Sequence, residues 1–269
     1  MSVELTHFFQ RIENNREERS FSKQSYSEAW LKMKHDAYIE LNDDLVKAYY
    51  ANNTYKTYKG YRLVAIDGSR IQLPNTTEVI EEFGIAENKG KSIAMAMTSV
   101  SYDVLNNIVI AAYVDRYEAS ERKLAEYHIK KKREDTPKIK DIKLLDRGYP
   151  SVYLYAKMLV FGDNFVVRCN AEYLKEVKAF AHSTATDQII EIDLRTSERM
   201  RNTSLQQLVQ EHSLPILRLR IVKIVLDNGT TEYLLTSLLD QEIFSVDDLK
   251  RIYAYACFAS FAVERRNIF

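Results

Sequence analysis

Two aspartates in this sequence share a setting that suits carboxylate chemistry. Asp67 ends the apolar run Leu63–Ile66 and is followed by Gly68, where the missing side chain lets a ligand approach the backbone. Asp146 likewise ends the largely apolar run Ile142–Leu145. A buried carboxylate without a partner is costly, so each acid needs one. A divalent cation is one such partner, because Mg²⁺ takes oxygen from one or two carboxylates together with water and phosphate.

A plainer interpretation is that both acids belong to turns, since aspartate before glycine is common there. The residues alone do not decide between the two interpretations. Other chemistries find less support. The five histidines show no metal-ligand spacing, there is no glycine-rich phosphate loop, and neither Ser69 nor Ser151 has a nearby histidine in the sequence.

Hydrophobic periodicity predicts the elements that would position the two aspartates. Three strands are followed by alternating helix and strand, which favours a mixed α/β fold with helices on the faces of a mixed sheet. The expected strands cover residues 61–73, 92–104, 107–114, 143–145 and 164–169, and the expected helices begin at Ser120 and Ser151.

The regions on either side have different patterns. Residues 1–55 are expected to be helical, with Ser27 as an N-cap, and residues 52–60 are a candidate linker. Residues 172–240 alternate strand-like runs with turns, which predicts a β-rich subdomain outside the core sheet. A further helix is expected to begin after Ser245. The apolar stripe of the first region consists of Trp30, Met33, Ala37, Leu41, Leu45 and Ala48.

Two short motifs resemble a known family. Ala65–Ser69 and Leu145–Ser151 are similar to the first and second acidic motifs of insertion-sequence DDE transposases, in the group with a β-strand insertion. The spacing of 79 residues between Asp67 and Asp146 suits three strands and a helix. Three further segments are similar to the leader of that family and to the lead-in of its third motif: Phe21–Gln24, Val46–Tyr50 and Phe244–Leu249.

The resemblance implies a ribonuclease H-like core with a β-rich insertion and a helical N-terminal region. It divides the chain into four parts: a helical DNA-binding leader (residues 1–55), the core (60–171), the insertion (172–240) and the start of the C-terminal core helix (241–269).

The same resemblance implies a function. A DNA transposase would cleave and transfer strands with two Mg²⁺ or Mn²⁺ ions held by Asp67, Asp146 and a later glutamate. Its partner would be the double-stranded DNA of the transposon ends, and the resemblance leaves room for a homodimer. Two alternatives stay open, a non-catalytic DNA-binding transposase remnant and a ribonuclease H-like nuclease unrelated to transposition.

The third acidic motif departs from the family pattern. A shifted register would make Glu264 the third acid, although an exposed acid at the end of a helix is the plainer interpretation of it. We therefore expect a C-terminally truncated or frameshifted copy that is weak in strand cleavage and still binds DNA. In the register anchored at Tyr253, the positions of the expected Arg, Glu and Lys hold Ala256, Ser260 and Asn267.

Composition sets further bounds. The 38 basic residues balance the 38 acidic ones, which counts mildly against nucleic-acid binding, although two basic stretches (122–143 and 195–220) soften that objection. No apolar run is long enough to span a bilayer. Cys169 and Cys257 lie in apolar surroundings and are expected to be buried free thiols, which together with the polar N-terminus predicts a cytoplasmic protein.

Overall fold

The computed structural model describes residues 22–265, apart from residues 89, 137, 197 and 227. The chain divides into two compact units, Met1–Asp44 and Leu45–Phe269, and each is described by itself. No helix in the described part of the chain is long and apolar enough to cross a membrane.

The described part of the first unit is helical, as the sequence predicts. Helix α2 (Lys23–Leu31) begins after Ser22, whose hydroxyl accepts a hydrogen bond from the backbone N–H of Ser25 (3.1 Å). The predicted N-cap Ser27 is therefore wrong, because it lies inside the first helix. Helix α3 (His35–Ala51) follows after a short break and continues into the second unit.

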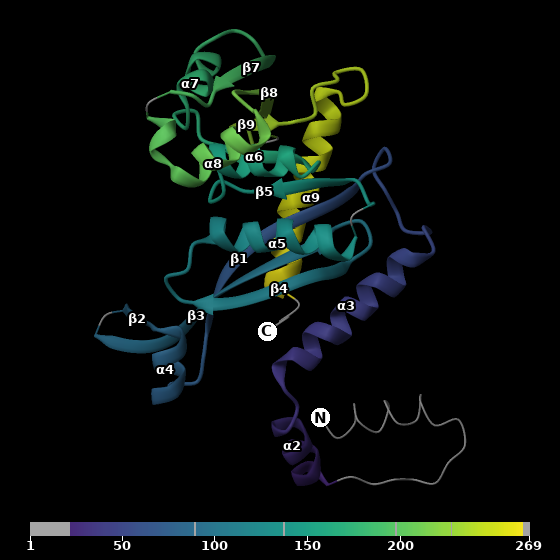
Figure 1. The fold of residues 1–269 in the computed structure, drawn as a ribbon, viewed down its shortest axis with the longest axis vertical. Coiled ribbons are helices and arrows are strands. Elements are labelled where there is room, and N and C mark those ends of the chain that lie inside the picture. Colours follow the sequence, from purple (N-terminus) through teal and green to yellow (C-terminus); the bar gives the residue numbers. More distant parts are fainter. Residues whose placement is uncertain (1–21, 89, 137, 197, 227, 266–269) are drawn as a thin grey trace. The chain divides into compact units, whose positions relative to one another are not determined.

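The second unit is built on one mixed sheet, which has nine strands in the described residues (Figure 1). Its order is β2-β3-β1-β5-β6-β9-β8-β7, and β4 pairs with β3 beside this path. Strand β1 pairs antiparallel with β3 and parallel with β5, and β5 pairs parallel with β6. The strands are β1 (Arg62–Gln72), β2 (Ile85–Asn88), β3 (Lys91–Asp103), β4 (Ile108–Arg116), β5 (Asp141–Leu145), β6 (Asn164–Cys169), β7 (Asp187–Asp193), β8 (Ile216–Val225) and β9 (Thr231–Thr236).

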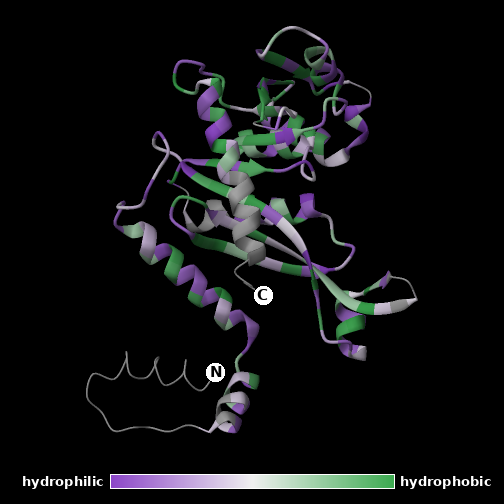
Figure 2. Cartoon of the chain, turned by 180° about the vertical axis from the view of Figure 1, so that it is seen from behind, coloured by the Kyte–Doolittle hydropathy of each residue, from purple (hydrophilic) through white to green (hydrophobic). Residues whose placement is uncertain are grey.

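Helices cover both faces of this sheet. Figure 1 shows α5 in front of the strands, and Figure 2, seen from behind, shows α9 in front of them. The remaining helices lie around the strands of residues 164–236 or beside β2 and β3. The helices of the second unit, besides the end of α3, are α4 (Thr77–Phe83), α5 (Glu121–Asp135), α6 (Val152–Val160), α7 (Lys175–Ala181), α8 (Thr203–His212) and α9 (Val246–Arg265), with a short 3₁₀ turn at Arg199–Arg201.

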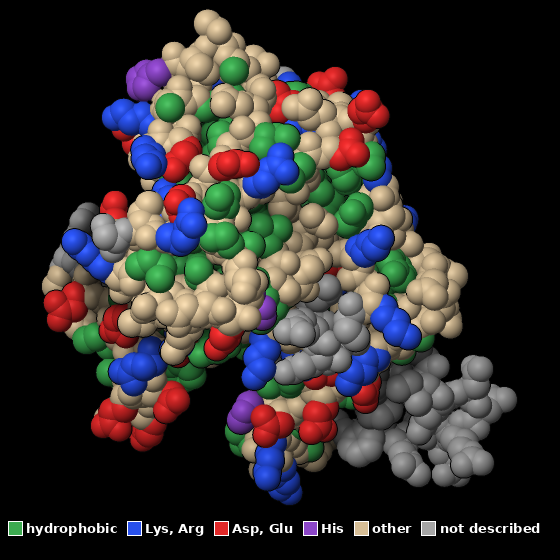
Figure 3. All heavy atoms as spheres, turned by 45° about the horizontal axis from the view of Figure 1, so that its top comes forward, with side chains coloured by type: hydrophobic (Ala, Val, Ile, Leu, Met, Phe, Trp, Pro, Cys, Tyr) green, Lys and Arg blue, Asp and Glu red, His purple; other side chains and the backbone are tan. Residues whose placement is uncertain are grey.

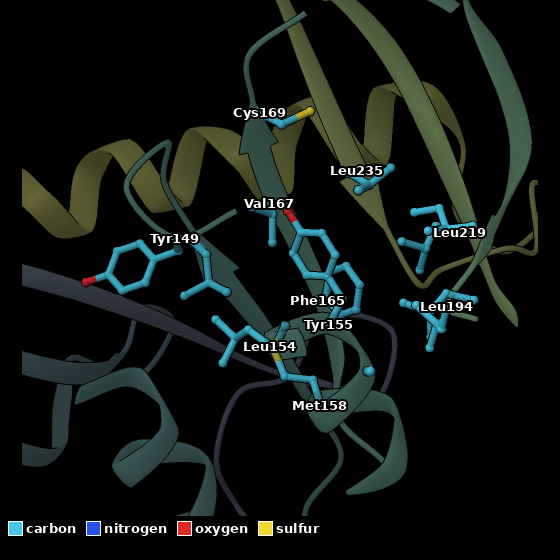
Figure 4. Packing of buried hydrophobic residues seen from close by; sticks show 14 of the residues in the cluster. Tyr149, Leu154, Tyr155, Met158, Phe165, Val167, Cys169, Leu194, Leu219 and Leu235 are labelled. Atoms are coloured by element: carbon cyan, nitrogen blue, oxygen red, sulfur yellow. The ribbon is translucent and has the colours of Figure 1, made fainter. Parts of the chain in front are cut away.

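Alternate residues of β1 supply the two cores, because successive side chains of a strand point to opposite faces. Leu63 and Ala65 join the cluster that includes Leu249 and Ile252 of α9. Ile66 joins the larger cluster on the other face, which includes residues of α5, α6 and α8. Figure 4 shows this second cluster, in which the Tyr155 and Phe165 rings are stacked with their centroids 5.0 Å apart.

The predicted core is confirmed. The order β-β-β-α-β-α-β is present from β1 to β6, with α4 and β2 as an addition between the first two strands. The turn predicted near Asn106 joins β3 to β4, and Asn107 adopts a positive φ of 57° there. This is the mixed α/β fold, with helices on the faces of a mixed sheet, that the sequence predicts.

The prediction that the insertion lies outside the core sheet is wrong. Strand β9 pairs antiparallel with β6, so the strands of residues 172–240 extend the same sheet. Two α-helices in this region, α7 and α8, were also not predicted. The cause is physical: β6 would otherwise be an edge strand, and an exposed edge is stabilised by pairing.

Candidate active site

Strand pairing brings the two predicted aspartates to one level of the sheet. The parallel register of β1 and β5 pairs Ala65 with Leu144, and two residues further along each strand lie Asp67 and Asp146. Asp67 is half-buried in β1, and its Oδ1 accepts a hydrogen bond from the backbone N–H of Gly68 (3.0 Å). Asp146 follows directly after β5 and is exposed. Two neighbouring parallel strands therefore place their acids at one level, at the C-terminal end of β5.

A buried ion pair supports that register. Arg62 and Asp141 are register partners at the N-terminal ends of β1 and β5, away from Asp67 and Asp146. The Arg62 guanidinium donates hydrogen bonds to both Asp141 oxygens, at 2.9 and 3.0 Å. Lys143 donates to the same carboxylate at 2.8 Å. All three side chains are buried. A one-residue shift of β5 would therefore leave unpaired charges in the interior and would also displace Asp146.

A third carboxylate, from Glu121, lies between Gly68 of β1 and Gly148 in the turn that follows Asp146. A Cβ added to Gly68 would lie 3.0 Å from the Glu121 Cγ, and one added to Gly148 would lie 2.5 Å from its Oε2. The space that Gly68 was expected to leave for a ligand is thus occupied by this side chain. No sequence motif singles out Glu121, although it directly follows Ser120, the predicted start of a helix.

The three carboxylates affect one another. Burial raises the pKa of Glu121 most, and the negative charges of Asp67 and Asp146 raise it further, against the opposing effects of Arg70 and Arg122. Like charges held together in this way favour either a shared proton or a bound cation. Glu121 is therefore close enough to Asp67 of β1 and to Asp146 after β5 to sense both charges.

The Tyr149 hydroxyl lies at the same site. It would be 3.2 Å from a Cβ added to Gly68, it is buried, and it has no hydrogen-bond partner among the described residues. Figure 4 shows the ring directed away from the rest of its cluster. Burial raises the pKa of Tyr149, and Asp67 and Glu121 raise it further, so the phenol stays protonated and can donate a hydrogen bond.

Asp146 is held by an arginine. The distance between Nε of Arg168 and Oδ1 of Asp146 is 2.5 Å. Nη2 of Arg168 donates a hydrogen bond to Oδ2 of Asp146 at 2.9 Å. Its Nη1 lies 3.4 Å from Oε1 of the buried Glu232, whose Oε2 accepts a hydrogen bond from Arg147 at 2.7 Å. This ion pair, with its one hydrogen bond from Nη2, holds the Asp146 carboxylate and competes with any other cation for it.

The remaining predicted acid, Glu264, lies near the end of α9, and its side chain is outside the described residues. The same holds for Cys257 and for the alternative position Ser260. Tyr253 is buried against the sheet, and the Arg168 guanidinium lies 5.9 Å from the centre of its ring. The role of Glu264 therefore stays a prediction.

The second basic stretch of the sequence is largely neutralised. Four of its five arginines pair with carboxylates, and on the face shown in Figure 3 the described basic and acidic side chains are interspersed. A broad basic surface from this stretch is therefore not supported. The pairs are Arg195 with Asp193, Arg199 with Glu176, Arg218 with Glu191 and Arg220 with Asp187.

The site suits a hard divalent cation in its donor chemistry. Asp67, Asp146 and Glu121 offer carboxylate oxygens only, which Mg²⁺ and Mn²⁺ prefer. Gly68 and Gly148 leave the space that lets the Glu121 side chain lie beside β1 and beside the turn after β5. In the described part of the chain, no three acidic, histidine or cysteine side chains are already grouped closely enough to hold a metal ion.

Comparisons with known proteins give a fold likeness only. No family model and no curated protein matches this chain. The piggyBac transposase synaptic complex with hairpin DNA is 12% identical, with a TM-score of 0.43, and the match covers 76% of this chain and 40% of that one. The Mos1 mariner paired-end complex with Mn is 10% identical, with a TM-score of 0.28 and coverage of 61% and 50%.

A nuclease is also similar. The NurA nuclease from Sulfolobus solfataricus is 10% identical, with a TM-score of 0.33, and the match covers 91% of this chain and 98% of that one. This chain spans less than half the length of the piggyBac protein that it matches. At such identities and scores, a function has to be derived from the residues of this chain.

Proposed function

We propose that this chain is a metal-dependent enzyme that cleaves DNA strands, of the transposase type, with Asp67, Asp146 and Glu121 as its acidic residues. The observation that supports this proposal is the position of Glu121 against Gly68 and Gly148. It places a third carboxylate beside Gly68 of β1 and beside the turn that follows Asp146, and phosphoryl transfer uses carboxylates that hold divalent cations. A transposase complex and a nuclease are among the structures similar to this chain, which agrees with this class of reaction.

The carboxylates would hold the cation, and a bound divalent cation would stabilise the charge that develops at phosphorus. Glu121 is suited to accept the proton of an attacking water or hydroxyl, because its pKa is raised toward neutral pH, where a general base works best. The Tyr149 hydroxyl is placed to donate a hydrogen bond to an oxygen of the substrate. Arg168 would hold Asp146 in place until a cation binds Asp146 or a phosphate binds Arg168.

One observation favours the alternative of a non-catalytic DNA-binding protein. Arg168 interacts with both oxygens of Asp146, and an arginine in that place neutralises the acid without a metal. The two functions differ in whether cleavage occurs at all.

The test is a cleavage assay with the full chain, Mg²⁺ or Mn²⁺, and DNA that carries the sequences flanking its gene. Asp67→Asn, Asp146→Asn and Glu121→Gln should each lower the rate by roughly 10²-fold or more, because each removes a metal ligand or a general base. Glu126→Gln is the matched control, since Glu126 is on the same helix and pairs with Lys157 instead. It should leave the rate within about 2-fold.

Other outcomes have defined meanings. Full activity of Glu121→Gln together with loss of activity in Glu264→Gln would show that the third acid comes from α9. Absence of cleavage with clear DNA binding would establish the non-catalytic alternative. Cutting of any plasmid DNA, with no dependence on flanking inverted repeats, would identify a general nuclease and overturn the transposase proposal.

A further inference from the structure

A cavity of about 610 Å³ lies beside the candidate active site. It is lined by the N-terminal ends of α5 and α6 and by residues of the insertion between Tyr173 and Leu205. The volume is within the range of roughly 300–1,000 Å³ that small-molecule and nucleotide sites occupy. Its position makes it the opening nearest to Glu121 among the described cavities.

The cavity is joined to the active site through Arg122. This residue follows Glu121 in the chain, lines the cavity, and donates a hydrogen bond from Nε to the carbonyl of Gly148 (3.3 Å). Pro150 and Ser151, which also line it, continue the turn that carries Asp146. One short stretch of backbone therefore forms a wall of both sites.

Cations and hydrogen-bond donors dominate the lining. Arg122 and Lys175 are exposed and no ion pair with Arg122 is found among the described residues, whereas Lys175 lies 4.0 Å from Glu176. Arg199 is mostly buried and is held by the carbonyl of Asp193 at 2.6 Å. Three polar side chains add donors: Ser151, Thr196 and Asn202.

Two acids oppose these cations. Glu198 also lines the cavity. Glu176 lies 3.3 Å from Arg199 and 4.0 Å from Lys175, so the three positive charges exceed the two negative charges by one. A net positive lining with hydroxyl and amide donors suits phosphate oxygens, and arginine in particular binds them with two parallel hydrogen bonds. The Tyr153 and Tyr173 rings in the same lining offer surfaces on which a sugar or a base can pack.

We infer that this cavity binds the sugar-phosphate backbone of the DNA strand that enters the active site. That the bound strand is DNA rests on the proposed function. That the cavity binds phosphate rests on its lining residues alone. Arg122 and Lys175 contact phosphate, and Glu198 weakens the contact. Phosphate contacts of this kind fix the position of a strand without reading its sequence.

The test measures binding of a fluorescent duplex oligonucleotide to the full chain by anisotropy in EDTA, where no metal-dependent cleavage occurs. Arg122→Gln and Lys175→Gln should each weaken binding by roughly 3- to 10-fold and lower the slope of log affinity against log salt by about 1. Glu198→Gln should tighten binding, which damage to the fold would not do. Lys178→Gln is the matched control, because Lys178 is on α7 but pairs with Glu172 outside the cavity.

The outcomes separate the sources of phosphate. Equal losses in Lys175→Gln and Lys178→Gln, or no tightening in Glu198→Gln, would overturn the inference. Binding of inorganic phosphate that depends on Lys175, with DNA affinity unchanged in every variant, would show a free-anion site and overturn it as well. Cavity-dependent DNA binding without cleavage in Mn²⁺ would support the cavity and refute the proposed function.

Discussion

At the scale of single residues, two glycines decide where the third carboxylate lies. The backbone of Gly148 approaches Glu121 so closely that an added Cβ would lie 2.5 Å from Oε2. The atom in contact is the far end of a flexible side chain, so the fold tolerates an alanine while the carboxylate has to move. Under the proposed function, Gly148 would therefore affect the reaction through the position of Glu121, without touching a substrate.

Gly148→Ala should lower DNA cleavage by about 10-fold or more, because it displaces an acid from the site, and should change the melting temperature little. The check is a double-mutant cycle with Glu121→Ala. In the Glu121→Ala background the added methyl group has no carboxylate to displace, so Gly148→Ala should cost little further activity. Equal losses in both backgrounds would mean that the glycine serves the backbone and not Glu121.

The sequence predicts part of this site for a clear reason. Asp67 and Asp146 each close a hydrophobic run, and the strand pattern alone places both at the end of a strand. Glu121 begins a helix that comes from another part of the chain, and its contact with the two glycines depends on how α5 packs on the sheet. Nothing in the local pattern around Glu121 shows that packing.

At the scale of elements, His128 connects α5 to the sheet and so helps to position Glu121. The imidazole is buried, its Nε2 lies 3.0 Å from the Ser99 hydroxyl of β3, and its ring lies against Tyr113 of β4. Burial lowers the pKa of His128 from 6.5 to about 3, and the nearby charge of Lys143 contributes to this shift. The folded protein therefore holds this histidine neutral.

The consequence is a pH dependence of stability. Between about pH 6.5 and pH 3 the unfolded chain binds a proton at His128 that the folded chain does not, so stability falls by roughly 1.4 kcal/mol for each unit of acidification. Urea unfolding should show a loss of about 2 kcal/mol from pH 7 to pH 5. His128→Gln keeps a hydrogen-bonding group beside Ser99 and should flatten this slope. An unchanged slope in the variant would assign the effect to other groups.

Elements were predicted well where one pattern dominates and less well where two patterns mix. The core strands have long apolar runs and were found. Helix α8 has apolar residues at helical spacing: Leu205, Leu208 and Val209. Strand-like runs precede and follow it, so the sequence pattern of the region predicts strands and turns. The β-branched residues of the neighbouring segments dominate the local pattern, so this pattern does not predict the short amphipathic helix between them.

At the scale of the whole second unit, the insertion and the core share one sheet and one hydrophobic cluster. Strand β6 pairs with β5 on one side and with β9 on the other. The cluster on the α6 face runs from Leu145 and Phe165 of the core to Leu219 of β8 without interruption. Sheet pairing across the boundary joins residues far apart in sequence, which local patterns do not reveal. The two regions should therefore unfold together.

Leu219→Ala should destabilise the core as well as the insertion. Leu219 is fully buried, and removing its side chain should cost about 2–5 kcal/mol because it leaves a cavity. Hydrogen exchange at Leu145 of β5, measured in the folded protein, should rise by the same free energy as exchange in β8, since both open in one cooperative step. Ile189→Ala is the control: Ile189 is 38% exposed on the neighbouring strand β7, and its loss should cost less than about 1 kcal/mol. Faster exchange in β8 with unchanged protection at Leu145 would show that the insertion opens by itself, and the shared sheet would then not couple the two regions.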